Sequence, residues 1–352
     1  MTWCCPLHHG TLSPGAGVLR AECCGREFPV VEGIPDLRVS NAAWVDFDRD
    51  LQAARALAAR VPRHDLPGTV RAVFARRAGW TAERIEARTT MTLALAERMR
   101  DEWTTWLAPV AAHPGPFLDL GCGAGSFLSV APHAGARLGI DVSMEWLVVA
   151  QRMCQANGVE VHLAAALAEA LPLRAGSVGA LTALDVIEHV GDQAAMVREI
   201  ERVLQPAGIF CAATPNRFSI AAEPHVGVWG VGWLPRSLQA DYVRWRANLS
   251  YEFTRLLSQR EIKALFRQNA SFVPEVDPAP IPSVDRERFG WRRRLLADRY
   301  NGLLHNTRFR SVARNFGAFF HIRGIKPGLA RLTTLVLTLW ALGLPEWIVP
   351  LA

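Results

Sequence analysis

The sequence predicts an α/β fold built on a doubly wound, mostly parallel sheet. From residue 117 onward, short apolar runs of strand length alternate with longer helical stretches. Alternation of this kind is typical of a parallel sheet covered by helices on both faces. Three closely spaced glycines directly after the first apolar run support the same fold, because ligand-binding sheets turn tightly after their first strand. The 352 residues suffice for one large domain or two modest ones.

Two segments precede this alternating pattern. Residues 1–38 are rich in Cys, His, Gly and Pro, and we expect a small loop-rich module there. Residues 39–114 are rich in Ala, Leu, Arg and Glu, and Asp50–Arg60 and Ala82–Leu107 are their clearest helical stretches. A Pro-Gly-Pro sequence at 114–116 then ends the helical segment.

The sheet domain is expected over residues 115–326, with insertions at 216–250 and 277–316. The second insertion contains an arginine-rich helical stretch at 286–314. The predicted strands are Phe117–Leu120, Arg137–Ile140, Val159–Leu163, Ala180–Leu184, Ile209–Ala213 and Phe319–Ile325. Helices are expected at 125–134, 143–157, 193–204 and 258–269. Residues 327–352 form an apolar tail, in which the uncharged apolar run Leu332–Pro345 is about 14 residues long. That run is shorter than the roughly 20 residues of a membrane span, so a packed terminal helix is expected, with an interfacial anchor as the alternative.

Charge and cysteine content limit the classes of partner and compartment. The net charge of +6 comes almost wholly from arginine, because Lys263 and Lys326 are the only lysines. Such a balance fits codon bias alone, or an anionic partner such as a phosphate-bearing substrate, a membrane surface or RNA. The 7 cysteines, an odd number, do not suggest a disulfide framework. We therefore expect a reduced, cytoplasmic compartment, and no signal peptide is visible.

A glycine-rich turn follows the first predicted strand. Gly121, Gly123 and Gly125 let the backbone turn tightly and let a ligand approach closely. Asp119 lies two residues before the first glycine, at the carboxyl end of the strand, where ligands bind in such sheets. A carboxylate there would oppose a pyrophosphate but favours a ligand with an ammonium and a sulfonium. S-adenosylmethionine is such a ligand.

A second acid, Asp141, ends the next predicted strand, 20 residues after Gly121. At the tip of strand two, a carboxylate is in reach of a ribose diol. Each acid alone is also compatible with a simple turn cap. Two acids at strand ends around one glycine turn favour a nucleoside-binding site.

Family resemblance extends this reading beyond the glycine turn. The motifs are Phe117–Gly125, Gly139–Ser143, Leu181–Val190, Val203–Phe210 and Thr214–Phe218. Together they resemble class I S-adenosylmethionine-dependent methyltransferases, especially the branch of ubiquinone-pathway O-methyltransferases. The resemblance implies a Rossmann-like sheet of seven strands whose last strand is antiparallel, and it implies S-adenosylmethionine as cofactor.

The sequence departs from the family pattern at two positions near the implied adenine site. Leu167 stands where the family often has an Asp, and Val178-Gly179 replaces the usual Phe-Asp. Adenine recognition would then rest on backbone groups near Ala168 and on apolar stacking by Val142 or Met144. The implied cofactor contacts are Asp119, Gly121, Cys122, Gly123, Gly125, Asp141, Val142, Met144, Ala168 and Asp185.

Asp185, Glu188 and His189 follow predicted strand four at the same edge of the sheet. His189 titrates near neutral pH and is our candidate for the base that takes a proton from an acceptor hydroxyl. The resemblance also implies that Asp185, Glu188 and His189 gather a divalent cation. A purely structural role, such as capping the next helix, is the alternative.

The first 38 residues resemble short zinc ribbons found ahead of some RNA methyltransferases. Zinc needs four N or S ligands, and the candidates are Cys5, His8, Cys23 and Cys24. The second ligand pair is irregular, because Ala21 stands where a partner of Cys24 belongs. A degenerate ribbon held by its apolar residues is the alternative to an intact zinc site.

Three functions remain open from the sequence. The leading one is methyl transfer, at oxygen, to a small-molecule, glycan- or lipid-linked acceptor. An RNA methyltransferase is favoured by the ribbon and the charge, although the turn typical of base-amine methylation is absent after strand four. A non-catalytic S-adenosylmethionine-binding protein is the third. Residues 286–352 combine arginines with an apolar tail and suggest peripheral membrane contact.

Overall fold

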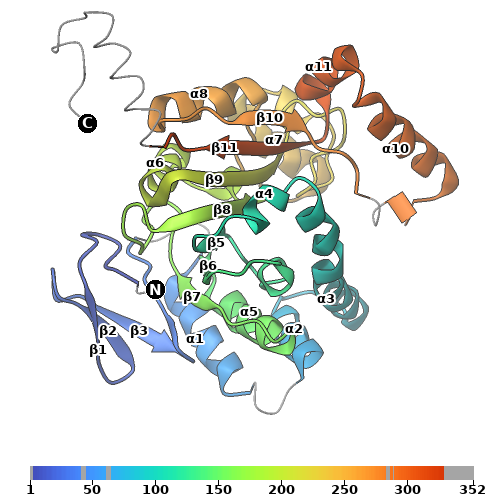
Figure 1. Cartoon of the computed structure of the whole chain (residues 1–352). Coiled ribbons are helices and arrows are strands. Elements are labelled where there is room, and N and C mark those ends of the chain that lie inside the picture. The colour runs from blue at the N-terminus through green and yellow to red at the C-terminus, as the bar shows by residue number, and fades with distance from the viewer. Residues whose placement is uncertain (1–2, 41–44, 61–64, 283–285, 288, 329–352) are drawn as a thin grey trace, which may run out of the picture.

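The computed structural model describes residues 3–40, 45–60, 65–282, 286–287 and 289–328 (Figure 1). The predicted apolar tail lies outside the described residues. No helix within the described part of the chain is long and apolar enough to span a bilayer.

A seven-stranded sheet forms the centre of the described structure, in the order β10-β11-β9-β8-β5-β6-β7. Strands β5 to β9 pair in parallel, whereas β11 is antiparallel to β9 and to β10. The α/β prediction is therefore confirmed, including the antiparallel strand over Phe319–Ile325. The strands are β5 Phe117–Leu120, β6 Arg137–Asp141, β7 His162–Ala165, β8 Val178–Leu184, β9 Leu204–Pro215, β10 Glu275–Pro278 and β11 Phe319–Ile325.

Helices cover both faces of the sheet and create two cores. On one face, α5 (Met144–Ala156) packs against α1 (Phe47–Ala58) and α2 (Leu66–Ala75). On the other face, α6 (Gln193–Val203) packs against α8 (Gln259–Asn269). The long helix α3 (Ala82–Thr104) and the short α4 (Ala108–Ala111) complete the helical N-terminal segment. Their order in the chain is the blue-to-green part of Figure 1.

The helix predicted at 125–134 is wrong, since only a single 3₁₀ turn, η2, forms at Leu128–Val130. The N–H of Ser129 donates to the carbonyl of Gly125, and the next bonds are the shorter i to i−3 type. Pro132 explains the early end, because the residue before a proline avoids the helical region. The glycine loop therefore returns to β6 without an intervening helix.

The described residues 3–38 of the N-terminal module (residues 1–38) fold as a four-stranded antiparallel sheet. Its strands are β1 Leu12–Pro14, β2 Val18–Ala21, β3 Glu27–Val31 and β4 Ile34–Pro35. The module ends against the central sheet, where Asp36 bridges Ala165 of β7 in parallel and the Leu37 N–H donates to the Ala165 carbonyl at 2.7 Å. The module is thus joined to the β7 edge of the central sheet by an isolated bridge and a backbone hydrogen bond.

Two helical additions follow β9. The first contains η4 (Val231–Trp233) and α7 (Arg236–Ala247), around a small core of its own. The second contains α10 (Trp291–Leu303) and α11 (Thr307–Phe316), which project from the upper right of the sheet in Figure 1. Helix α7 was not predicted, because aromatic and glycine residues obscure its period. Strand β10, which lies in a proline-rich stretch, was also missed.

Candidate cofactor and catalytic site

The glycine loop has the backbone that its sequence predicts. Gly121 and Gly123 take positive φ values of 74° and 50°, which other L-residues rarely adopt. A Cβ on Gly121 would lie 2.3 Å from Val186 Cγ2, so the loop packs tightly on the turn after β8. A Cβ on Gly123 would meet nothing within 4 Å. The loop is therefore packed on one side and open at Gly123, as a cradle for a ligand requires.

Asp119 is buried, with a relative exposure of 3%, between β6 and β8. Thr182 Oγ1 donates to its carboxylate at 2.8 Å. Burial, assisted by the charge of Asp141, raises the pKa of Asp119 to about 7. A buried carboxylate of this kind is stabilised by a cation, so the site fits the ammonium of S-adenosylmethionine.

Asp141 connects the glycine loop to the start of α5. Its two carboxylate oxygens accept hydrogen bonds from the N–H groups of Gly123 and Ser143, each at 2.8 Å. A carboxylate has about four acceptor positions, so both oxygens retain capacity for ribose hydroxyls. Asp141 thus fits a ribose diol, while its backbone bonds hold the loop at the tip of β6.

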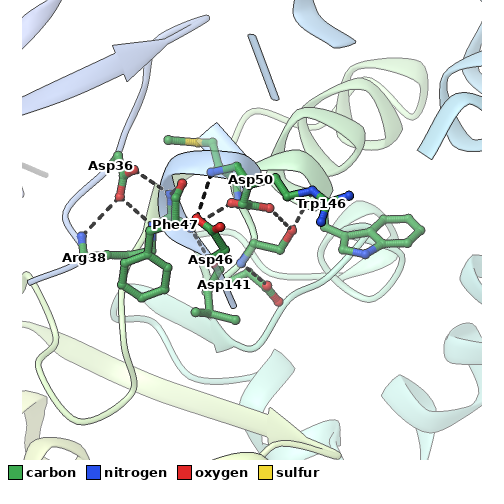
Figure 2. A network of polar contacts seen from close by, with 11 residues as sticks. Asp36, Arg38, Asp46, Phe47, Asp50, Asp141 and Trp146 are labelled. Carbon is green, nitrogen blue, oxygen red and sulfur yellow. Dashed lines mark hydrogen bonds and ion pairs between the residues drawn. The ribbon is translucent and has the colours of Figure 1, made fainter. Parts of the chain in front are cut away.

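A buried arginine supports this region from the N-terminal module (Figure 2). The Arg38 guanidinium donates to both carboxylate oxygens of Asp36, to Asp50 at 2.7 Å and to the Val142 carbonyl at 2.9 Å. Asp50 in turn accepts from the Met144 N–H at 2.7 Å. Three parts of the chain therefore meet at the start of α5: the module, α1 and the segment after Asp141. Sequence reasoning missed Arg38 and Asp50.

The structure separates the predicted adenine contacts. Val142 is half-buried, whereas Met144 is fully buried in the core beneath α5 and offers no surface to a ligand. Met144 is therefore dropped as a stacking residue, because α5 begins there and turns its side chain into the core. Cys122 and Ala168 are also buried, with relative exposures of 7% and 8%.

A second group of polar residues lies after β8 at the same sheet edge. Glu188 is buried, and burial together with the charge of Asp185 raises its pKa to about 8. Its Oε2 accepts from Thr214 at 2.9 Å, while Oε1 has no hydrogen-bond partner among the described residues. The Tyr251 hydroxyl is likewise buried without such a partner there. Unpaired buried polar groups are costly, so this place is suited to a polar ligand.

His225 joins this group from the loop after β9, and sequence reasoning missed it. Its Nε2 lies 3.1 Å from His189 Nε2, and its Nδ1 donates to Glu223 at 2.5 Å. The hydrogen bond to Glu223 raises the pKa of His225, whereas burial lowers that of His189. The sequence feature that could have indicated His225 is its position, because Glu223 and His225 follow the carboxyl end of a parallel strand, where ligands bind.

The predicted cation ligands are only partly brought together. Glu188, His189 and His225 place one ligand atom each within 4.8 Å of one another. Asp185 is not in this group: it is exposed and takes a left-handed backbone at φ 54°, where the chain turns out of β8. Glu188 and His189 do not cap the next helix, because Asp192 caps α6.

The four predicted zinc ligands do come together. Cys5, His8, Cys23 and Cys24 place their ligand atoms within 4.8 Å of one another, at the tips of the module's hairpins. Cys4 and His9 contact each other instead, at 3.9 Å.

Comparison with known proteins finds sequence relatives for the central part of the chain. Residues 118–212 match a family described as a methyltransferase domain. The ubiquinone biosynthesis O-methyltransferase of Methylocella silvestris is 32% identical over 165 residues, which cover 45% of this chain and 61% of the relative. The enzyme of that name from Dinoroseobacter shibae is 30% identical over 173 residues, or 46% of this chain and 67% of the relative.

Other curated relatives match over a smaller part of their length, down to 43% for the enzyme from Methylococcus capsulatus, so the chain spans between about two fifths and two thirds of the length of the curated relatives it matches. Among solved structures, a phosphoethanolamine N-methyltransferase 2 of Haemonchus contortus in complex with S-adenosylmethionine is 18% identical, with a TM-score of 0.46. That alignment covers 72% of this chain and 59% of the other. By its sequence relatives and its strand order, the chain belongs to the class I S-adenosylmethionine-dependent methyltransferases.

Proposed function

We propose that this protein transfers the methyl group of S-adenosylmethionine to an oxygen atom of a small-molecule, glycan- or lipid-linked acceptor. The observation that carries the proposal is the adjacency of two sites. Gly121 of the cofactor loop packs on Val186, which lies between Asp185 and the buried Glu188. The relatives named ubiquinone biosynthesis O-methyltransferases support oxygen as the accepting atom. Release of S-adenosylhomocysteine on addition of fractionated cell metabolites tests the activity, and no release with any fraction would contradict it.

The chain's own residues would bind the acceptor, align it with the methyl group and remove its proton. The cofactor supplies a methyl on a sulfonium, which is already a good leaving group, so alignment of the acceptor accounts for much of the rate. The acceptor oxygen forms its bond to the methyl carbon as the sulfur–carbon bond breaks. The hydroxyl proton passes to the histidine pair, His189 and His225, which lie within hydrogen-bond distance of each other. Glu188 Oε1 lies 3.9 Å from His225 Nε2 but has no hydrogen bond among the described residues, and the Tyr251 hydroxyl has none there either. These two groups would hold the acceptor's polar groups.

A divalent cation is the competing role for the same residues. The two Nε2 atoms, 3.1 Å apart, and a buried carboxylate match the donor set of two histidines and one carboxylate that transition metals accept. Such a cation would lower the pKa of an acceptor hydroxyl. Turnover that survives chelation discards the cation and leaves the histidine pair as proton acceptor.

Cofactor affinity should depend on Asp119. Asp119→Asn removes the negative charge but keeps the shape, and we expect S-adenosylmethionine to bind about tenfold or more weakly, as for a lost charge-assisted contact of about 1.5–3 kcal/mol. Asp141→Ala should weaken binding to a similar degree. Isothermal titration calorimetry measures both. Unchanged affinity in both variants, or binding of NADH in place of S-adenosylmethionine, would refute the assignment of the cofactor site.

The same site predicts a pH dependence. The pKa of Asp119 is about 7 without ligand, and only its ionised form attracts an ammonium. Affinity should therefore rise as the pH increases through 7, then fall once the ligand's own α-amino group deprotonates near pH ~8. Asp119→Asn should abolish the rising limb. Calorimetry in two buffers of different ionisation enthalpy at pH 6.5 reports the proton released on binding.

We further propose peripheral contact with an anionic membrane through α10 and α11. Trp291 and Leu296 are exposed by 71% and 66% on α10, beside exposed arginines. The acidic side chains of Asp277 and Asp298 pair with Arg310, Arg314 and Arg286. The exposed arginines that remain available to lipid are Arg292, Arg293, Arg294, Arg299 and Arg308.

Liposome flotation tests this contact. We expect more protein on vesicles with anionic lipid than on neutral vesicles, because each basic residue near the surface contributes about 1 kcal/mol. The variant Arg292→Glu/Arg293→Glu/Arg294→Glu should lose that difference, while Arg71→Glu on the distant α2 should keep it. Equal flotation on both lipids would exclude the contact.

A further inference from the structure

The two hairpin tips of the N-terminal module share one backbone pattern. At the first tip, the Cys5 N–H donates to the Gly10 carbonyl and the His9 N–H to the Cys5 carbonyl. At the second, the Ala21 N–H donates to the Arg26 carbonyl and the Gly25 N–H to the Ala21 carbonyl. The fifth residue of each tip, His9 or Gly25, takes a positive φ of 54° or 69°. The tips are therefore equivalent turns that face each other.

Equivalent positions in the two turns carry possible metal ligands. The first position is Cys5 in one turn and Ala21 in the other, and the fourth is His8 or Cys24. Ala21 is fully buried and offers no ligand, so the symmetric set has three members. Cys23, at the third position of its turn, supplies the fourth ligand atom, because its Sγ lies 3.8 Å from His8 Nδ1.

A glycine makes this substitution possible. A Cβ on Gly10 would lie 2.8 Å from Cys23 Cβ and 2.9 Å from Cys23 Sγ, closer than real Cβ contacts. Gly10 ends the first turn, so its missing side chain leaves the space through which Cys23 reaches the group. The neighbouring residues Cys23 and Cys24 can both approach the group in this way.

The spacing of the four atoms fits a tetrahedral ion. Zinc–sulfur and zinc–nitrogen bonds of about 2.3 Å and 2.0–2.1 Å require edges of roughly 3.8 Å between two sulfurs and 3.5 Å between sulfur and nitrogen. Cys5 Sγ lies 3.9 Å from both Cys24 Sγ and His8 Nδ1. The cysteines are free thiols, and a disulfide would require a sulfur separation near 2.05 Å.

We infer that the N-terminal module binds one zinc ion through the three thiolates of Cys5, Cys23 and Cys24 and through Nδ1 of His8. The site is structural: all four positions are filled by protein, and a module of this size seldom folds on apolar packing alone. Each thiol loses its proton on binding. This inference does not depend on the proposed methyl transfer.

Metal content of the purified full-length protein tests the site. After purification with zinc sulfate and dialysis, elemental analysis should find about one zinc per chain. Cys23→Ser removes a direct ligand and should weaken zinc binding by more than the roughly 100-fold that the loss of an outer-shell partner costs at most. The double variant Ala21→Cys/Cys23→Ser restores the symmetric set and should regain zinc, which separates ligand loss from failure to fold.

Cys4→Ala is the matched control, since Cys4 contacts His9 outside the group, and it should retain zinc. Cobalt substitution adds a readout of ligand type: the sulfur-to-cobalt charge-transfer absorption should fall by about a third in Cys24→Ser. Absence of zinc from the wild-type chain overturns the inference. The inference is also overturned if Cys23→Ser binds zinc as tightly as the wild-type chain. It is overturned too if Cys4→Ala loses as much zinc as Cys23→Ser and Ala21→Cys/Cys23→Ser does not regain it.

Discussion

Replacing His189 or His225 by alanine should lower turnover by about 10²-fold or more, the usual contribution of a general base, and leave cofactor affinity nearly unchanged. The Nε2 atoms of the two histidines lie 3.1 Å apart. Glu223 orients His225 by accepting a hydrogen bond from its Nδ1. Neither side chain belongs to the glycine loop. Steady-state kinetics and calorimetry on the same preparations separate the two effects.

The pair should also behave as one unit. If a single proton passes through both rings, the double variant His189→Ala/His225→Ala costs about as much as either single one, because effects within a catalytic unit are not additive. His305, exposed beyond α10, provides a matched control whose alanine variant should keep full activity. Full activity in both His189→Ala and His225→Ala would eliminate the pair from the mechanism.

Arg38→Ala should lower the free energy of unfolding by about 3–5 kcal/mol, the usual cost of breaking a buried ion pair from one side. The Arg38 side chain is exposed by only 1%, and its loss leaves the carboxylates of Asp36 and Asp50 without their cation. Arg71→Ala is the control, because Arg71 and Glu86 form a solvent-exposed pair, and such pairs contribute little to the free energy of unfolding. Urea denaturation followed by circular dichroism measures both variants.

Arg38→Ala should further weaken S-adenosylmethionine binding, since the lost guanidinium also holds the Val142 carbonyl beside Asp141. Arg38→Met/Asp36→Asn removes one stranded charge and should recover part of the stability but not the contact to Val142. A stability for Arg38→Ala equal to that of Arg71→Ala would show that the network contributes nothing.

The sequence located those features that depend on local order. Phe117–Leu120 and Phe319–Ile325 were predicted with their observed bounds, because apolar runs flanked by turn residues define a buried strand. Asp119 and Asp141 followed from the rule that ligands bind at the carboxyl edge of a parallel sheet. The strand predicted at Val159–Leu163 begins later, at His162, because the Val159 N–H is still bound to the Cys154 carbonyl of α5.

Features that depend on contacts between distant segments could not be predicted from the sequence. Asp50 meets Ser143 across 93 positions, and Arg38 meets Val142 across 104, so no local pattern indicates either pair. His225 lies in an insertion without clear periodicity, where only the fold shows that its loop returns over Glu188. Met144 is apolar, as a stacking residue would be, but it is the first residue of α5 and its side chain is buried in the core.

The pairing of Asp36 and Leu37 with Ala165 has a consequence for solubility. A strand at the edge of a sheet presents unpaired amides and carbonyls, which can recruit a strand from another molecule and begin aggregation. The N-terminal module covers that edge at β7 with its own backbone. The opposite edge, β10, is protected differently: it is four residues long, ends in Pro278, and carries Asp277 bound to Arg310 and Arg314 of α11. The sheet is thus shielded from self-association at both edges. The β10 edge is short and carries a proline and a paired charge, and the N-terminal module covers the β7 edge.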